Sequence, residues 1–330
     1  MTVEFPVIDL GDYLDGRNGA AQTAASALRR ALETVGFYAV VNHGVPWSKV
    51  DGIFAQAKRF HDQDMAAKTA LAFSADFTGY VAPSKAVLRT SQVNRNTKGD
   101  LNEAYFIERE SPPPGADPAR AAAFTSPNQW PADLPDFRES ALDYYGTVEG
   151  LARALLPLYA LALDLPEDWF EPAFDWPQAS LRLTHYPPLP REDNQFGIAP
   201  HTDAGFLTIL PQSDVTGLHI RPRGQDWMKA PRVEQGFFVN SGDMLKRWSN
   251  DRLLSTQHMA VNESERERYA AVFFFSPNLD YEMACLPTCQ DEANPPRYAP
   301  ITYRQYRAWF MDSNYRAENE PRARADAVGV

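Results

Sequence analysis

Short β-type runs follow one another through the second half of the chain, and they constrain its fold more than any other feature. Between Ser180 and Pro277, runs rich in β-branched and aromatic residues are separated by turn residues: SLRLTHY, FLTIL, GLHI, GFFVN and RYAAVFFF. Several short strands at such spacing are typical of a β-sandwich or barrel. We therefore expect an all-β core over 180–277.

The flanking regions carry helical patterns instead. The clearest has Ala24, Leu28 and Leu32 on one apolar stripe. Outside the core, the periodicity predicts helices over 20–35, from 47 onward, over 144–158 and over 301–315, and a strand over 37–42. The predicted fold class is mainly β with flanking helices: a helical N-terminal region and a C-terminal helix.

We expect one structural unit made of four consecutive segments. These are an N-terminal helix and strand region (1–120), a linker and long helix (121–177), the β core (178–280) and a C-terminal helix and tail (281–330). The stretch 111–134 contains SPPPG and PNQWPADLP. It has too many prolines for a helix or a central strand, so we expect a long surface connection there.

The charge balance narrows the class of partner. The chain has 32 Lys and Arg against 43 Asp and Glu, a formal net charge of −11. An acidic surface repels nucleic-acid phosphates and anionic lipid. No apolar run reaches the ~18 residues that span a bilayer, no signal-peptide pattern is visible, and two cysteines are too few for a disulfide framework. We expect a soluble, cytoplasmic protein that handles a small molecule or another protein, with neither nucleic acid nor membrane as partner.

His201 and Asp203 stand two positions apart, just before the run FLTIL. In an extended chain, residues i and i+2 project from the same face, so the imidazole and the carboxylate share one space. His258, in the run STQHMAV, is the candidate third ligand. Two histidines and one carboxylate leave positions open on a metal, which suits non-haem Fe(II) binding O₂ and a bidentate organic acid together; zinc usually keeps at most one open. Alone, a His-x-Asp triplet also fits a solvated polar turn.

Arg268 opens the apolar strand RYAAVFFFSP. By alternation its side chain shares a face with Ala270 and Phe274. A guanidinium in such a strand must be paired or hydrogen-bonded, and a carboxylate ligand that binds and leaves would satisfy it with bidentate geometry. Two alternatives stay open: Arg268 marks an exposed edge of the strand, or it pairs with Glu263 or Glu265.

The run LRLTHYPP places Arg182, Thr184 and Tyr186 on one face by the same alternation, and Tyr186 can offer a hydroxyl to the same anion. His185 points the other way and is interpreted as a surface or second-layer residue. The other histidines have no carboxylate two residues away in a β context. We expect His43 to serve a turn, His61 to face solvent at a helix end and His219 to pack in the sheet.

With these residues in place, the chain resembles the isopenicillin N synthase-like family of Fe(II)/2-oxoglutarate-dependent oxygenases over nearly its whole length. The resemblance rests on FPVIDL, GFYAVVNHGV, PNQWP, LRLTHYPPLP, APHTDAGFLTIL, GLHI, VNSGDML, WSND, STQHMAV and RYAAVFFFSP in this order. It implies a double-stranded β-helix (jelly-roll) core. It also implies Fe(II) held by His201, Asp203 and His258, and 2-oxoglutarate anchored by Arg268 and Tyr186.

One departure from the family pattern concerns the cosubstrate. The family usually carries Arg-x-Ser on the last core strand, with both side chains on the distal carboxylate of 2-oxoglutarate, and often Asn where Thr184 stands. This chain has Ala270 in place of the Ser. The lost hydroxyl costs ~1 kcal/mol of cosubstrate binding unless water or Thr184 substitutes. Some members of the family oxidise their substrate without an oxo-acid, so that alternative stays open.

The activity that the resemblance implies is oxidation of a small molecule. Fe(II), 2-oxoglutarate and O₂ would give succinate, CO₂ and an Fe(IV)-oxo species that hydroxylates, desaturates or cyclises the substrate. No catalytic residue is assigned beyond the metal ligands. The alternatives are a 2-oxoglutarate-independent iron oxidase of the same fold, a non-catalytic jelly-roll binding module and, weaker still, a zinc hydrolase.

The substrate pocket is expected between the stretch 80–106 and the final helix near Tyr303, Tyr306 and Phe310. Phe274 is a candidate wall of this pocket because it lies on the ligand face of its strand. Arg89 and Arg95 are candidates to receive a substrate carboxylate, and the alternative is that both are solvated loop arginines. The sequence does not discriminate among classes of small molecule.

Overall fold

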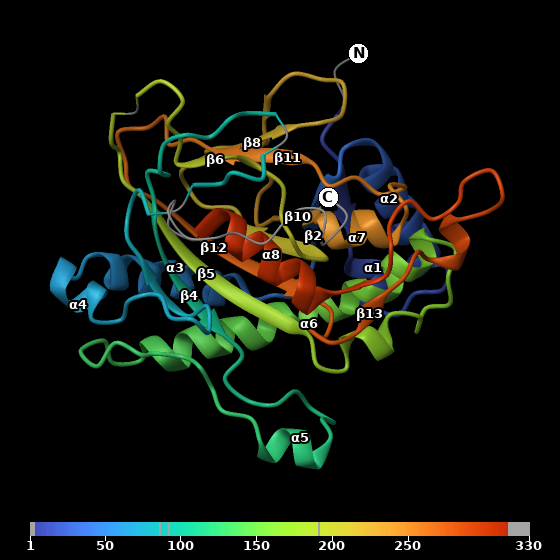
Figure 1. The fold of residues 1–330 in the computed structure, drawn as a ribbon, viewed down its shortest axis with the longest axis horizontal. Coiled ribbons are helices and arrows are strands. Elements are labelled where there is room, and N and C mark those ends of the chain that lie inside the picture. Colours follow the sequence, from blue (N-terminus) through green and yellow to red (C-terminus); the bar gives the residue numbers. More distant parts are fainter. Residues whose placement is uncertain (1–3, 86, 92, 191, 316–330) are drawn as a thin grey trace.

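The computed structural model describes residues 4–85, 87–91, 93–190 and 192–315. Within them, two β-sheets face each other and helices lie around them (Figure 1). The major sheet has the order β1-β2-β10-β7-β12-β5-β4-β3, and its neighbours are antiparallel except for β1 with β2. Its strands are β1 (Val7–Asp9), β2 (Phe37–Val41), β3 (Gly79–Val81), β4 (Glu103–Glu108), β5 (Gln178–Tyr186), β7 (Leu207–Pro211), β10 (Phe237–Ser241) and β12 (Arg268–Ser276).

The minor sheet is antiparallel throughout, in the order β6-β11-β8-β9. Its strands are β6 (Ile198–His201), β8 (Leu218–Arg221), β9 (Met228–Lys229) and β11 (Gln257–Ala260). Two facing antiparallel sheets confirm the predicted β core.

Alternation along β12 gives the core its two sides. Ala270 packs between the sheets with Tyr186, Ile198 and Ala260, whereas Phe273 faces the other way and packs edge-on against Tyr145 of a flanking helix. Because side chains alternate, each long central strand faces the flanking helices with one half of its residues and the space between the sheets with the other half.

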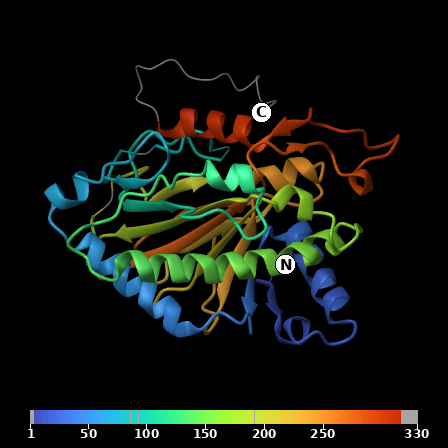
Figure 2. The same cartoon turned by 90° about the horizontal axis from the view of Figure 1, so that it is seen from below.

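The helices that flank the major sheet are amphipathic. In α2 (Ala20–Thr34), Leu28 and Leu32 are buried. The longest helix, α6 (Phe137–Ala162), continues past Pro157. They join the large apolar core on the outer face of the major sheet, where two of them run alongside each other under the strands (Figure 2). The N-terminal and central helices are α1 (Gly11–Leu14), α2 (Ala20–Thr34), α3 (Trp47–His61), α4 (Met65–Thr69), α6 (Phe137–Ala162) and α7 (Asp243–Trp248), with a 3-10 turn at Glu171–Phe174.

Strands from the N-terminal part of the chain extend the major sheet. β2 pairs with β10 on one side, and β4 pairs with β5 on the other. Every residue of β4 is buried, which fits its place between two strands and below covering helices.

The proline-rich stretch 111–134 differs from the prediction in one respect. It contains a short helix, α5 (Pro118–Ala122), on the loop that projects from the body of the molecule (Figure 1). Proline is tolerated at the first helical position, where its missing N–H would have no intrahelical partner, and the Asp117 side chain caps the Arg120 N–H at 2.9 Å. The expectation that prolines exclude a helix here was therefore wrong.

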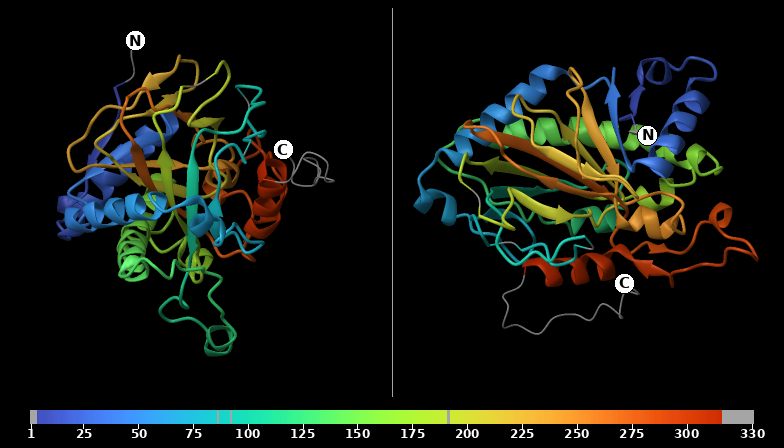
Figure 3. Two further views of the ribbon diagram at one scale, coloured as in Figure 1. Left: turned by 90° about the vertical axis from the view of Figure 1, so that its left-hand side faces the viewer. Right: turned by 90° about the horizontal axis from the view of Figure 1, so that it is seen from above.

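The chain ends with β13 (Glu282–Met283), a 3-10 turn at Pro287–Cys289, β14 (Ile301–Thr302) and α8 (Tyr303–Tyr315). Helix α8 lies on a different side of the sheets from α3 and α6 (Figure 3). It is tied to β4 by Arg307–Glu108 at 2.7 Å and to α7 by the Tyr306 hydroxyl, which donates to Asp243 at 3.0 Å. In the described part of the chain, none of the helices has both the length and the apolar character required to cross a bilayer.

Candidate active site

Three side chains that are distant in the sequence meet between the two sheets. His201 ends β6 and His258 stands opposite it on β11, as paired residues of the two strands. Their ring centroids are 4.2 Å apart, and each Nε2 is 3.7 Å from Oδ1 of Asp203. The structure thus brings together the three predicted metal ligands.

Hydrogen bonds to backbone carbonyls fix the orientation of the two histidine rings. Nδ1 of His201 is 2.8 Å from the Ala199 carbonyl, and Nδ1 of His258 is 3.1 Å from the Thr256 carbonyl. Because a carbonyl only accepts, each Nδ1 carries a proton, and Nε2 is the nitrogen that can bind a metal when the ring is neutral.

Asp203 is oriented in the same way. Its Oδ2 accepts from the Thr208 hydroxyl at 2.6 Å and from the Asn240 amide at 2.8 Å, which leaves Oδ1 to face the histidines. Burial works against the ionised carboxylate, but His258, His201 and these two hydrogen bonds outweigh it and hold the pKa of Asp203 below its usual value. Burial, followed by the nearby His258, lowers the pKa of His201, so its imidazole is neutral.

This donor set fits Fe(II). Two neutral imidazole nitrogens and one ionised carboxylate oxygen are the facial set of non-haem iron oxygenases. A separation of 3.7 Å lets both atoms of a pair lie about 2.1 Å from one ion. The hydrogen bonds behind each ligand are those that fix a metal ligand in place.

Arg268 lies at the start of β12, which is a central strand, and its side chain is 5% exposed. Its guanidinium lies over the ring of the paired Tyr186, 4.4 Å from the centroid. Nε and Nη1 are buried without a hydrogen-bond partner among the described residues, and Arg268 forms no ion pair there. Neither alternative for Arg268, an exposed edge or a pair with Glu263 or Glu265, is what the structure contains.

The backbone leaves room for this guanidinium at Gly217. A Cβ on Gly217 would lie 3.0 Å from Arg268 Nε and 2.6 Å from the Val261 carbonyl. Only a residue without a side chain therefore allows Arg268 to occupy its position.

Thr184 faces Ala270 across the β5–β12 pair. Its hydroxyl is fully buried and has no hydrogen-bond partner in the described part of the chain. Buried hydroxyls are normally bonded, so two unsatisfied polar groups, the Thr184 hydroxyl and the Arg268 guanidinium, lie on neighbouring inward-facing positions of the same strand pair.

A cavity of about 100 Å³ opens beside the three ligands and is lined by His201 and Asp203 themselves. The apolar part of its wall is mainly aromatic: Phe73, Phe77, Phe106, Phe274, Tyr303 and Phe310. The structure thus places Phe274, Tyr303 and Phe310 where the sequence predicts them, and adds Glu108, Arg182 and Arg307 as charged lining residues. Tyr306, predicted beside them, does not line the cavity, because its hydroxyl is turned to Asp243.

Arg89 and Arg95 lie elsewhere. Both line a separate, open cavity between residues 87–91 and 93–97, and none of the three ligands lines it. Arg95 is exposed. The structure therefore does not bring these two arginines to the cavity beside the ligands.

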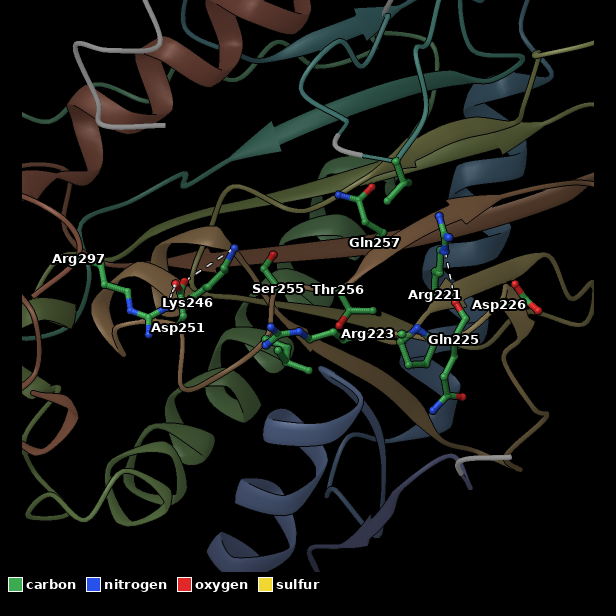
Figure 4. A pocket seen from close by; sticks show the side chains of 14 residues that line it. Arg221, Arg223, Gln225, Asp226, Lys246, Asp251, Ser255, Thr256, Gln257 and Arg297 are labelled. Atoms are coloured by element: carbon green, nitrogen blue, oxygen red, sulfur yellow. Dashed lines mark hydrogen bonds and ion pairs between the residues drawn. The ribbon is translucent and has the colours of Figure 1, made fainter. Parts of the chain in front are cut away.

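Another cavity, of about 740 Å³, is also separate from the ligands (Figure 4). Gln257 and Arg221, paired across β11 and β8, line it, whereas the next pair, His258 and Ile220, faces inward. Figure 4 shows Lys246 and Arg297 turned toward Asp251, at 3.8 and 3.0 Å. Asp251 therefore partly neutralises the positive charges of Lys246 and Arg297 in this outer cavity.

A second group of two histidines and a carboxylate lies on the helix side of the major sheet: His61, Glu103 and His185. His61 is 4% exposed and its Nε2 is 3.1 Å from the Leu183 carbonyl. The expectation that it faces solvent was wrong, because α3 packs on the sheet and turns its last residue inward. His185 lies in a second layer, as predicted.

Sequence reasoning missed several residues of both groups. Asn240 and Thr208 hold Asp203 from strands of the major sheet, and Lys68 donates to Glu103 at 2.8 Å. Alternation assigns a face to each strand residue, but it does not say which distant strand or helix lies opposite, and no local signal marks these partners.

Taken together, two imidazoles and a carboxylate between facing antiparallel sheets, with a cavity at their side, define a non-haem iron oxygenase of the jelly-roll class. The chain belongs to the 2OG-Fe(II) oxygenase superfamily: residues 177–277 match the model of that superfamily, and residues 5–133 match the N-terminal family described as "non-haem dioxygenase in morphine synthesis N-terminal". It is a 2-oxoglutarate- and Fe(II)-dependent oxidoreductase.

Relatives along the whole chain agree. The chain is 34% identical to the 2-oxoglutarate-Fe(II) type oxidoreductase hxnY of Emericella nidulans, over 95% of this chain and 91% of that protein. It is 33% identical to the Kihadalactone A synthase LFS of Citrus sinensis, over 92% and 91%. The crystal structure of the dioxygenase for auxin oxidation in rice has the same fold, with a TM-score of 0.71, 25% identity and coverage of 92% and 94%.

Proposed function

We propose that this oxidoreductase couples the oxidative decarboxylation of 2-oxoglutarate to the oxidation of a C–H bond in a small organic molecule. One oxygen atom of O₂ enters succinate as CO₂ leaves, and the other becomes the hydroxyl group of the product. When a second hydrogen is removed instead, as in desaturation or ring closure, that oxygen leaves as water.

The observation that carries this proposal is the state of Arg268. It is a buried cation without a protein carboxylate in the described residues, and it lies between the same two sheets as the iron ligands. Burying an unpaired charge is costly. A bound dicarboxylate removes that cost with bidentate hydrogen bonds, which an arginine fork forms better than a lysine.

The residues have separate tasks in this scheme. His201, Asp203 and His258 would hold Fe(II), which supplies the activation of O₂ when it is bound. Arg268 binds the distal carboxylate of 2-oxoglutarate, and the ring of Tyr186 packs against the guanidinium and fixes its orientation. The mainly aromatic cavity excludes water and orients the substrate beside the ligands.

Thr184 takes the place of the absent serine. Its hydroxyl has no protein partner in the described structure and faces Ala270, the position where the family pattern has Ser. A hydroxyl on the opposite strand at the same level can donate to the same carboxylate. This supports cosubstrate use and weighs against the 2-oxoglutarate-independent oxidase.

An anaerobic titration tests the cosubstrate site. The protein loaded with Fe(II) is titrated with 2-oxoglutarate by calorimetry, and succinate is measured against O₂ uptake. We expect Arg268→Lys to weaken 2-oxoglutarate binding by more than about tenfold, since a point charge cannot match two oxygens, and the exposed neighbour change Arg266→Lys to leave it unchanged. Equal affinity in Arg268→Lys and wild type would refute the assignment, and O₂ uptake independent of 2-oxoglutarate would identify the oxidase instead.

A further inference from the structure

We propose that the cavity beside the iron ligands takes a compact, single-ring carboxylate, and that Arg182 binds its carboxylate group. This inference rests on the proposed function, because it treats that cavity as the substrate site.

Arg182 comes to the cavity from the middle of β5. It is paired with Phe106 of β4 and with Val272 of β12, and all three side chains face the space between the sheets. The guanidinium lies 5.3 Å from the centre of the Phe106 ring. Nη2 donates to the side-chain oxygen of Asn102 at 2.9 Å, and Nε is buried without a partner in the described chain.

The cavity has a second arginine, and the contrast between them identifies the ligand charge. Arg307 has an acidic partner in the wall: it is 2.7 Å from the Glu108 carboxyl, whose pKa burial raises to about 7 against the opposing effect of Arg307, and it lies over the Phe77 ring. Arg182 has no carboxylate within ion-pair distance among the described residues. The charge of Arg182 does lower the pKa of the buried Asp100 carboxyl, but burial outweighs this effect and raises that pKa to about 7. Oδ1 of Asp100 accepts from the Ala199 N–H at 2.9 Å.

One cationic group without a counter-ion, in a mainly apolar site, selects an anion. A carboxylate matches the planar guanidinium with two parallel hydrogen bonds. A neutral analogue would leave the buried cation unpaired, and sites of this kind reject ligands that lack the matching polar group by large factors.

The walls set the size and shape of the rest of the ligand. Phe73, Phe106 and Phe274 line the cavity, whose volume is about 100 Å³. This is less than the ~150 Å³ of a cavity that binds one benzene molecule in another protein, so the cavity limits the ligand to a single small ring. A ring that carries a carboxylate must extend through the open side of the cavity, with its C–H bonds toward His201 and Asp203.

Arg182 is two positions along β5 from Thr184 and four from Tyr186, so the main alternative is that it contacts 2-oxoglutarate instead. A role in cosubstrate binding predicts a loss of 2-oxoglutarate affinity on substitution, whereas a role in substrate binding predicts none. A purely structural role, through the hydrogen bond to Asn102, predicts only a loss of thermal stability.

Calorimetry on the anaerobic Fe(II)–2-oxoglutarate complex distinguishes these three roles of Arg182. The probes are benzoate, phenylacetate and cyclohexanecarboxylate, each beside its primary amide. We expect at least one carboxylate to bind more than about tenfold tighter than its amide, and this preference to disappear in Arg182→Met and in Arg182→Gln. The matched control Arg223→Met removes an exposed arginine outside this cavity and should change nothing.

Each result of this experiment either supports the inference or overturns it. If no carboxylate binds better than its amide, or if the preference survives in both Arg182 variants, the inference is overturned. A loss of 2-oxoglutarate affinity in these variants would move Arg182 to the cosubstrate site and overturn it as well. If the wild-type protein binds Fe(II) but no 2-oxoglutarate, the proposed function fails first, which the opening titration shows before any probe is added.

Discussion

Two groups of two histidines and one carboxylate lie on opposite faces of the major sheet, and they differ in what surrounds them. His201 and Asp203 line a cavity, and no lysine or arginine forms an ion pair with them or with His258 in the described structure. In the other group, Glu103 accepts from His185 at 2.8 Å, from Lys68 at 2.8 Å and from the Tyr80 hydroxyl. We name the first the open cluster and the second, with Lys68 and Tyr80, the closed cluster.

The difference shows that ligand types alone do not make a metal site. In the closed cluster the ammonium of Lys68 already supplies the positive charge that Glu103 needs, and a metal ion would be repelled by it. Burial opposes the ionised form of Glu103, but hydrogen bonds from His185, His61, Lys68 and Tyr80 outweigh it and hold its pKa well below the usual range. The open cluster has no lysine or arginine in ion-pair contact with its ligand atoms in the described structure.

The largest effect should come from the carboxylate of the open cluster. Asp203→Ala removes one of three protein ligands, so we expect loss of Fe(II) binding and of turnover with the fold retained. Iron content and circular dichroism measure the two. The matched change Glu103→Gln should keep iron binding, and a loss of iron there would break the contrast between the clusters.

The next largest effect should be on folding stability, to which the closed cluster contributes. Glu103→Gln leaves Lys68 buried, at 6% exposure, without its counter-ion. Breaking a buried pair in this way costs about 3 kcal/mol, which denaturant unfolding of the metal-free protein would measure. The double change Glu103→Gln with Lys68→Met should recover part of this loss. If Glu103→Gln unfolds like wild type, the closed cluster is not a stabilising element.

A smaller effect separates the two faces of β5, where His185 faces the closed cluster and Thr184 the open side. Thr184→Val removes a hydroxyl at constant shape, and we expect it to weaken 2-oxoglutarate binding by about fivefold, or ~1 kcal/mol. Ala270→Ser in the Thr184→Val background should restore it. Unchanged affinity in Thr184→Val would show that the hydroxyl does not reach the cosubstrate.

The smallest effect is a pH dependence of the closed cluster. Burial lowers the pKa of His185, but hydrogen bonds to Glu103 and Glu267 outweigh it and raise the pKa above its ordinary value. The stability from protonated His185 is then fully present below the unfolded pKa of about 6.5 and is lost as the pH rises through the folded pKa.

The melting temperature of wild type should therefore exceed that of His185→Gln by more at pH 6 than at pH 9. His219→Gln, on the minor sheet, serves as the control for a general pH effect. A difference that is constant across this range would show that His185 stabilises by packing on Tyr269 rather than by charge.

Alternation made part of the site predictable. A strand has a period of two, so His201 with Asp203, and Arg268 with Phe274, could be assigned to shared faces before any coordinates. The β-type run around His258 made it a candidate third ligand, but its convergence on them could not be derived from the residues, because it lies 55 positions after Asp203 and no local pattern fixes which strands pair.

Other parts depended on tertiary pairing and could not be predicted. His61 ends an amphipathic helix, where a polar residue is usually solvated, yet the packing of α3 on β5 buries it beside Glu103. Arg182 was correctly assigned to the inner face, but that its charge lacks a partner while Arg307 has Glu108 is visible only once β4 and α8 are in place.

The distribution of the iron ligands over the two sheets has a mechanical consequence. Both histidines belong to the narrow minor sheet, whereas Asp203 is held by Thr208 and Asn240 of the broad major sheet. A bound ion would join the sheets at this point, so metal uptake should slow amide hydrogen exchange in β6 and β11 more than in β12. The iron site would therefore also crosslink the minor sheet to the major sheet.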